Sequence, residues 1–138
     1  MANKKYVAHS DDARFEESVK ELLLFRKIVK VEKLDEQDGI LTLDNGTQLI
    51  VQGNCGCGGC GNGWYYLYEL NECDNAITNV KCELGTEGDD DVYNIFIFTE
   101  DTRINCVQYR GSDNGYYGVG YDLYVKLAEN ECQQCRTI

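Results

Sequence analysis

The sequence predicts an α+β fold that is mostly β: an N-terminal helix, then a mainly antiparallel sheet of about eight strands folded as a sandwich or open barrel. Three observations predict it. Apolar residues recur with helical spacing near the N-terminus and with period two along most of the remaining chain of 138 residues. Asn-Gly pairs at positions 45–46 and 114–115 are typical of tight turns. The chain has no proline and 14 glycines, so glycine and asparagine must supply its turns.

The helix is expected over residues 11–26. Apolar side chains there follow helical spacing, at Phe15, Val19, Leu22 and Leu23. The preceding polar residues suit the N-terminus of a helix, where a short side chain caps free amides and acidic groups favour the positive end of the dipole. These residues are the candidate caps Ser10, Asp11 and Asp12 and the acids Glu16 and Glu17.

The strands follow this helix, and the last of them has the longest alternation of apolar and polar residues. We expect strands at 29–32, 41–43, 49–51, 64–70, 77–84, 92–99, 103–109 and 117–127. One domain of residues 1–138 is therefore expected, with a helical segment at 1–27, a β body at 28–127 and a polar tail at 128–138.

The charge of the chain is strongly negative. Lys plus Arg number 13 and Asp plus Glu number 24, so the net charge is 13 − 24 = −11. This balance argues against a protein that neutralises nucleic-acid phosphates directly. No apolar run approaches the roughly 20 residues of a membrane span, and residues 1–6 lack a secretory signal. We therefore expect a cytoplasmic protein that binds neither membrane nor nucleic acid.

Eight cysteines and a single histidine point to a metal site rather than to catalysis. Cys57 and Cys60 stand in a Cys-x-x-Cys pair among glycines, and Cys132 and Cys135 form a second such pair in the tail. In a reducing compartment this spacing is typical of structural zinc. We expect one Zn²⁺ held by these four thiolates, which ties the tail back and leaves no open position for a catalytic water.

Alternatives to this ligand set remain open. Cys55 or Cys73 is a second choice for the metal, reduced thiols packed as small apolar groups are another interpretation, and disulfides are a third. Cys82 and Cys106 lie within expected strands and are predicted to be core residues.

Two further segments are candidate partner-binding surfaces. An acidic run contains Glu83, Glu87, Asp89, Asp90 and Asp91, which suits a solvated turn, a protein-binding patch or, less well, a calcium site. The glycine-rich stretch 111–121 suits a hairpin turn or an exposed tyrosine surface. Its candidate contact residues are Tyr116, Tyr117 and Tyr121.

His9 lies just before the expected helix and is predicted to be an exposed residue near the terminus. Because it is the only histidine, no Cys–His or Ser–His catalytic pair can form elsewhere in the chain. No pair of carboxylates stands out in the sequence either, so we do not expect an enzyme.

Two motifs carry a resemblance to a known family. Cys57-Gly-Gly-Cys60-Gly-Asn-Gly-Trp64-Tyr65 and Asn114-Gly-Tyr-Tyr-Gly118-Val-Gly-Tyr121 resemble motifs of a family of uncharacterised domains encoded mainly by tailed bacteriophages. The likeness extends over about residues 28–127. It implies a phage setting and a small β-rich body, with no activity to carry over.

Charge and resemblance together lead to an expected function. We expect a non-enzymatic protein of the host cytoplasm that binds and inhibits a host or phage protein with a basic face, such as a CRISPR nuclease or another defence enzyme acting on nucleic acid. A virion structural or assembly protein is the alternative, and a small enzyme is the second alternative.

Overall fold

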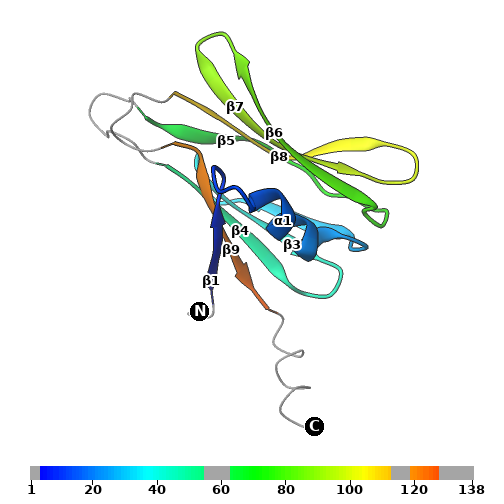
Figure 1. Ribbon diagram of the computed structural model, residues 1–138. Coiled ribbons are helices and arrows are strands. Elements are labelled where there is room, and N and C mark those ends of the chain that lie inside the picture. Colours follow the sequence, from blue (N-terminus) through cyan, green and yellow to red (C-terminus); the bar gives the residue numbers. More distant parts are fainter. Residues whose placement is uncertain (1–3, 55–62, 113–118, 128–138) are drawn as a thin grey trace.

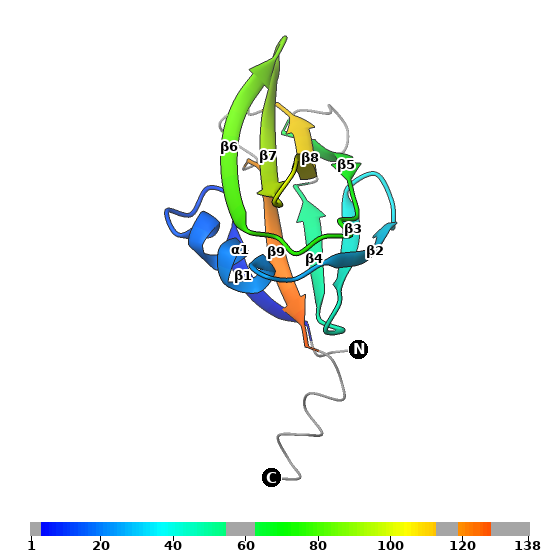
Figure 2. The same cartoon turned by 90° about the vertical axis from the view of Figure 1, so that its right-hand side faces the viewer.

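A computed structural model describes residues 4–54, 63–112 and 119–127 of the chain. This part of the chain forms two antiparallel sheets packed face to face, with one helix at the side (Figures 1 and 2). The elements in chain order are β1 (Lys5–His9), α1 (Phe15–Leu23), β2 (Ile28–Lys33), β3 (Asp38–Leu43), β4 (Gln48–Gly53), β5 (Tyr65–Leu70), β6 (Asn79–Glu87), β7 (Asp90–Phe98), β8 (Arg103–Gly111) and β9 (Tyr121–Lys126). The predicted fold class, mostly β with one helix, is confirmed, and the two sheets form a sandwich.

One sheet has five strands in the order β1-β9-β4-β3-β2, and the other has four in the order β5-β8-β7-β6. Their inner faces bury alternate residues, as period-two patterning requires. In β3, for example, Gly39, Leu41 and Leu43 are buried while the residues between them are partly exposed. The core therefore lies between the two sheets.

The helix α1 closes one open side of the sandwich, where it contacts β1 of one sheet and β6 of the other. Its inner residues Phe15, Val19 and Leu23 are buried, which confirms the helical spacing read from the sequence. At the opposite side, β5 packs against β3.

The helix is shorter than predicted at both ends, because tertiary contacts claim its flanking residues. Ser10 Oγ accepts a hydrogen bond from the Tyr121 amide, and Asp11 Oδ1 accepts one from the Tyr93 hydroxyl. The prediction that these side chains cap the helix is therefore wrong; the residue at the cap position is Arg14, whose side chain makes no capping bond. After the helix, the Phe25 amide donates to the Ile77 carbonyl at 2.7 Å, with Phe25 at a φ of 68°.

Strand β1 was not predicted, because its five residues bury only one side chain, Ala8, which is too little alternation to recognise. It pairs with β9, the strand with the clearest alternation.

The acidic run forms the end of a long hairpin rather than an extended loop. Strands β6 and β7 pair along their whole length and are joined by a two-residue turn at Gly88 and Asp89. We call residues 85–90 the hairpin tip. It projects beyond the rest of the sandwich in both views (Figures 1 and 2). A Cβ placed on Gly85 or Gly88 would meet no heavy atom within 4 Å, so the tip is free of tertiary packing.

Candidate functional site

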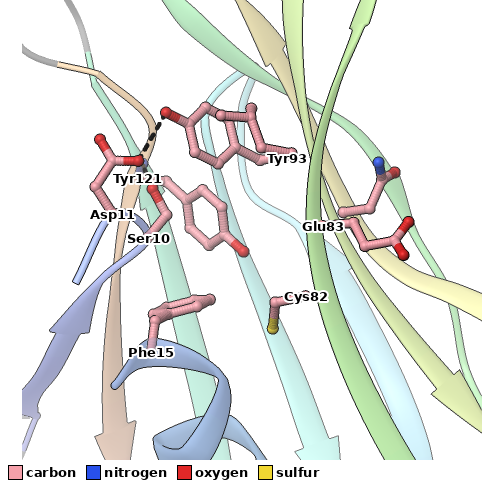
Figure 3. A pocket seen from close by; sticks show the side chains of 9 residues that line it. Ser10, Asp11, Phe15, Cys82, Glu83, Tyr93 and Tyr121 are labelled. Carbon is pink, nitrogen blue, oxygen red and sulfur yellow. Dashed lines mark hydrogen bonds between the residues drawn. The ribbon is translucent and has the colours of Figure 1, made fainter. Parts of the chain in front are cut away.

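A cavity of about 140 Å³ opens between the β1–α1 connection, the hairpin of β6 and β7, and the start of β9 (Figure 3). We call it the aromatic cavity. The residues that line it are Ser10, Asp11, Phe15, Cys82, Glu83, Leu84, Tyr93, Asn94 and Tyr121. It lies at the base of the projecting hairpin, because Cys82 and Leu84 belong to β6 and Tyr93 belongs to β7.

Two aromatic rings of the cavity, those of Phe15 and Tyr93, each stand nearly at right angles to the ring of Tyr121. The ring of Phe15 meets that of Tyr121 at 90° with centroids 5.7 Å apart, and the ring of Tyr93 meets it at 88° and 6.2 Å. On its other side, Tyr121 stacks on Tyr109 at 4.2 Å and 15°. Edge-to-face and stacked pairs of this kind fix ring orientation as well as burying apolar area. The walls of the cavity are therefore held in place by the core.

Polar groups are few and specifically placed. The Tyr93 hydroxyl donates to Asp11 Oδ1 at 2.9 Å, and the Cys82 amide donates to Glu16 Oε2 at 2.8 Å. Tyr121 contributes a further hydroxyl, on a side chain that is only 2% exposed. Figure 3 shows this hydroxyl directed toward Cys82.

The hydroxyl and thiol groups of the cavity are neutral at physiological pH. Burial raises the pKa of Cys82 to about 12, with the Glu16 carboxylate adding to the effect and Lys20 opposing it. Burial also raises the pKa of Tyr121 and, together with the hydrogen bond to Asp11, that of Tyr93. A thiol held so firmly in its protonated form is a poor nucleophile.

The two carboxylates of the lining are both accessible to water. The side chain of Asp11 is 40% exposed, and that of Glu83 is 49% exposed and pairs with Lys81 at 3.6 Å. In Figure 3 the Glu83 carboxylate lies across β6 from Tyr121, so Asp11 is the acidic group beside the rings.

The β1–α1 connection is held over the cavity by β9. The Ser10 amide donates to the Tyr121 carbonyl at 2.9 Å while Ser10 Oγ accepts from the Tyr121 amide at 3.1 Å. Gly120, at a φ of 67°, makes room for this contact, because a Cβ there would lie 2.0 Å from Ser10 Oγ. The final Gly-Tyr of the second motif therefore has a structural role that its spacing did not indicate.

His9 belongs to the same contact region. Its Nδ1 lies 2.8 Å from Asp122 Oδ1, and its Nε2 lies 3.8 Å from Asp11 Oδ2. The ring is only 29% exposed, so the prediction of an exposed residue near the terminus is wrong. The imidazole is positioned between carboxylates of β9 and the β1–α1 connection.

The expected partner-binding residues have different surroundings. Tyr121 is buried in the core, so its prediction as part of an exposed tyrosine surface is wrong; the alternation of β9 turns it inward. Tyr116 and Tyr117 lie outside the described residues. Asp89 is exposed and Asp90 half-buried at the hairpin tip, while Asp91 accepts a hydrogen bond from the Tyr65 hydroxyl at 3.0 Å.

The cysteines predicted to bind zinc, Cys57, Cys60, Cys132 and Cys135, lie outside the described residues, as does the second-choice ligand Cys55. Cys73 is buried, and its Sγ donates to the Asn75 carbonyl at 3.2 Å. Across 4–54, 63–112 and 119–127, no three His, Cys, Asp or Glu side chains form a group that could hold a metal. Cys106 is fully buried, as predicted, and Cys82 is partly buried against the core.

The residues that flank the two sequence motifs meet at one end of the sandwich. Gly53, at the end of β4, pairs with Tyr121 at the start of β9, and Tyr65 pairs with Gly111 at the end of β8. The Tyr65 amide also donates to the Asn54 carbonyl at 2.9 Å, which joins the two pairs. Lys126, by contrast, pairs with Gln48 at the other end of the sheet.

Comparison with known proteins gives a family and nothing more specific. No curated protein and no solved structure matches the chain. No helix within the described part of the chain is long and apolar enough to cross a membrane. A family model described as "Domain of unknown function (DUF7448)" matches residues 21–123, nearly the whole β body, which agrees with the resemblance to an uncharacterised domain family. The chain therefore belongs to the DUF7448 family.

Proposed function

We propose that this protein is a non-enzymatic, phage-type protein of the bacterial cytoplasm that binds a host protein through the acidic hairpin tip and inhibits it. The observation that carries the proposal is the projection of this tip beyond the sandwich (Figures 1 and 2). Glu87, Asp89 and Asp90 bring three carboxylates to residues 85–90, which contain no lysine or arginine. A tip of this charge complements a basic surface.

The hairpin is preorganised for such contact. Nine consecutive residue pairs join β6 to β7, from Asn79 and Phe98 to Glu87 and Asp90. Binding of a partner therefore does not require a flexible loop to become ordered, and the entropy lost in such ordering weakens many associations. Leu84, 59% exposed beside the tip, adds an apolar contact to the charged ones.

A basic partner with a nucleic-acid groove suits this shape and charge best. An acidic projection reaches into a groove that a flat surface would only cover, and long-range attraction accelerates the encounter at low salt. Occupation of the groove would exclude the nucleic acid. Nucleases of host defence systems, CRISPR nucleases among them, have surfaces of this chemistry.

The test is capture from host lysate by the full chain at low salt, with the bound protein then eluted by increasing salt. We expect one stoichiometric partner whose retention falls steeply with ionic strength. The variant Glu87→Gln/Asp89→Asn/Asp90→Asn should lower its affinity at least tenfold. A matched variant, Glu72→Gln/Asp74→Asn/Asp101→Asn, removes the same charge from exposed positions outside the tip and should retain the partner.

Two results would overturn the proposal. One is the absence of any stoichiometric partner at low salt. The other is equal loss of binding in the tip variant and in the matched variant, since net charge alone would then explain the attraction.

The cysteine pair Cys57 and Cys60 is proposed to hold a structural Zn²⁺. Support comes from the Cys-x-x-Cys spacing and from the residues that flank it, Asn54 directly after β4 and Gly63 two residues before β5. The Asn54 side chain donates to the Gly63 carbonyl at 2.8 Å, so both ends of the intervening segment are held together.

The tail is barely long enough to bring its cysteines to this site. The tail follows Lys126, at the far end of β9, and the six residues of β9 span about 20 Å. The six residues from Leu127 to Cys132 extend at most about 20–22 Å. A four-sulfur site within one chain thus needs a tail that doubles back almost fully extended.

Metal analysis of the purified chain decides between these ligand sets. We expect about one zinc ion per chain, lost in Cys57→Ser/Cys60→Ser. Loss of zinc in Cys132→Ser/Cys135→Ser as well would assign the tail cysteines as ligands, and retention would exclude them. If the protein purified under reducing conditions contains no zinc, the proposal is overturned.

A further inference from the structure

The outer edge of β6 is covered along only part of its length. In the order β5-β8-β7-β6, the two edge strands of this sheet are β5 and β6. At the edge of β5, the Leu67 amide donates to the Glu36 carbonyl at 2.8 Å. The Gln37 side chain donates to the Tyr65 carbonyl at 3.1 Å, so a neighbouring segment covers that edge. Strand β6 contacts α1, but it continues past the helix into the projecting hairpin (Figures 1 and 2).

The covered part of β6 ends at Cys82. The Cys82 amide donates to the Glu16 carboxylate at 2.8 Å, so it points away from β7 and toward α1. Every second residue of an antiparallel strand directs its amide and carbonyl the same way, so those of Leu84 and Thr86 also point away from β7. Among the described residues no hydrogen bond reaches either of these two amides. We call residues 84–86 the free edge.

The charge of the free edge distinguishes it from the edges of the other sheet. A strand with unpaired amides accepts a further strand unless its side chains prevent it, and lysine is a common protection. The edge strands of the five-stranded sheet carry lysines, Lys5 on β1 and Lys30 and Lys33 on β2. The free edge instead lies between two carboxylates, Glu83 and Glu87. These carboxylates determine which strand it can accept.

A second copy of this chain is a poor occupant. The register that uses both free amides of each copy places Leu84 opposite Thr86 of the other copy. Glu83 then lies opposite Glu87 on both sides of the pair, and like charges in directly opposite positions are destabilising. The net charge of −11 on each chain adds to the repulsion. The same carboxylates attract an extended segment that carries lysine or arginine at the facing positions.

The side chains of the edge specify the occupant further. Glu83, Gly85 and Glu87 share one face, because side chains alternate along a strand. Glu83 is 49% exposed, and its ion pair with Lys81 at 3.6 Å is an exposed one of little strength. A Cβ on Gly85 would meet no heavy atom within 4 Å, which leaves room for a large side chain of the occupant. Leu84, which is 59% exposed on the other face, favours an apolar neighbour.

We propose that the free edge of β6 binds an extended segment of a partner protein as an additional antiparallel strand. Lysine or arginine residues of this segment lie opposite Glu87 and Glu83, and a bulky residue lies opposite Gly85. Backbone bonds to Leu84 and Thr86 provide affinity, and the facing side chains provide selectivity. The inference rests on the proposed function, because it specifies how a basic partner contacts the hairpin.

Titration of the full chain with the peptide Lys-Val-Tyr-Val-Lys, acetylated and amidated at its ends, tests the inference by NMR. We expect saturable shifts centred on β6 and slower hydrogen exchange of the Leu84 and Thr86 amides, which become bonded. Methylation of the two valine amides removes the donors that face β6 and should lower the affinity at least about tenfold. Methylation of the tyrosine and second lysine amides, which face away, is the matched control and should change the affinity by less than about twofold.

Two pairs of variants test the edge from the side of the protein. Thr86→Pro removes an amide that does not bond to β7 and should lower the peptide affinity about fivefold or more, whereas Thr86→Val keeps this amide and should not. Glu83→Gln/Glu87→Gln should lower the affinity about tenfold at low salt. Glu72→Gln/Asp74→Asn removes the same charge from exposed positions outside the hairpin and should leave the affinity unchanged. Unfolding midpoints of all variants, measured alongside, show whether the fold is retained.

The results separate this inference from the proposed function. Loss of affinity confined to the valine-methylated peptide supports the inference, and any other pattern, or a dimer of the free chain that protects the Leu84 and Thr86 amides, overturns it. In capture from host lysate, Thr86→Pro should lose the partner that Thr86→Val retains. Equal retention by both variants would overturn the inference and leave the proposed function standing. If no partner is captured, the proposed function is overturned, and the peptide measurements still decide the inference.

Discussion

Two places at one end of the four-stranded sheet, where Asp91 pairs with Gly111 on one side and with Thr86 on the other, use glycine in opposite ways. Where β8 pairs with β5, Gly111 is confined by packing, because a Cβ there would lie 2.2 Å from the Trp64 carbonyl oxygen. At the hairpin tip, a Cβ on Gly85 would meet nothing within 4 Å. The first region is thus constrained by the core, whereas the tip is free to carry charge that the fold does not need.

The aromatic residues show the same contrast. Tyr65, Tyr109 and Tyr121 are fully buried, and Tyr109 donates its hydroxyl to the Gln37 carbonyl. Tyr68, on the edge strand β5, is 48% exposed, and the Cζ atom of Arg110 lies 3.7 Å from the centroid of its ring. Tyrosine abundance alone therefore says little about a recognition surface, because most of the tyrosines named here are structural.

The largest effect is expected from Tyr121→Ala. This change removes a fully buried ring and should lower the free energy of unfolding by about 3–5 kcal/mol. Tyr68→Ala, at a half-exposed position, should cost less than about 1 kcal/mol. Urea unfolding followed by circular dichroism measures both. Similar losses in the two variants would contradict the contrast between core and surface tyrosines.

A smaller loss is expected from Gly111→Ala. The added methyl group meets backbone oxygen and the Tyr65 ring, which cannot move freely, so a loss of about 1–3 kcal/mol is expected. Gly85→Ala serves as the control and should change stability by less than about 0.5 kcal/mol in either direction. A Gly111→Ala protein as stable as the Gly85→Ala protein would show that the end of the sandwich yields to the extra volume.

Alkaline pH should lower the free energy of unfolding through the ionisation of buried side chains rather than through the residues of the hairpin tip. Burial raises the pKa of Cys106 above its ordinary value of 9.0 and that of Tyr121 above 10.0. Groups with a raised pKa stabilise the fold below the pKa of the unfolded chain, and that contribution is lost as pH rises. Each such group lowers the free energy of unfolding by about 1.4 kcal/mol per pH unit in this range.

Melting temperatures measured from pH 7 to 11 check this, together with tyrosinate absorbance. Stability should stay level to about pH 9 and then fall, and the buried tyrosines should ionise only as the chain unfolds. Ionisation of all ten tyrosines near pH 10 in the folded state would contradict it.

The smallest effect is expected at the tip itself. Glu87→Gln/Asp89→Asn removes two exposed negative charges from a chain of net charge −11. Stability should change by less than about 0.5 kcal/mol, with a slight gain from reduced repulsion. Thermal unfolding at low and high salt measures it. A loss above 1 kcal/mol would mean that the tip contributes to the fold and is not free for recognition.

The sequence by itself determined the fold class, most strand positions and the inward face of α1, because each depends on a local period that burial imposes on neighbouring residues. The sequence predicted the first and last residues of the elements less well. The helix begins at Phe15 rather than at 11, since Ser10 and Asp11 bond to β9 and β7, which are more than 80 residues away in the chain.

Only the tertiary structure decided which residues make the aromatic cavity. Phe15, Cys82, Tyr93 and Tyr121 come from α1 and three different strands, and no spacing in the sequence connects them. Glycine at position 120 is explained only by the approach of Ser10, and the inward orientation of Tyr121 only by the pairing of β9 with β1 and β4. Local periodicity records which residues are buried, whereas contacts between distant segments determine which buried residues meet.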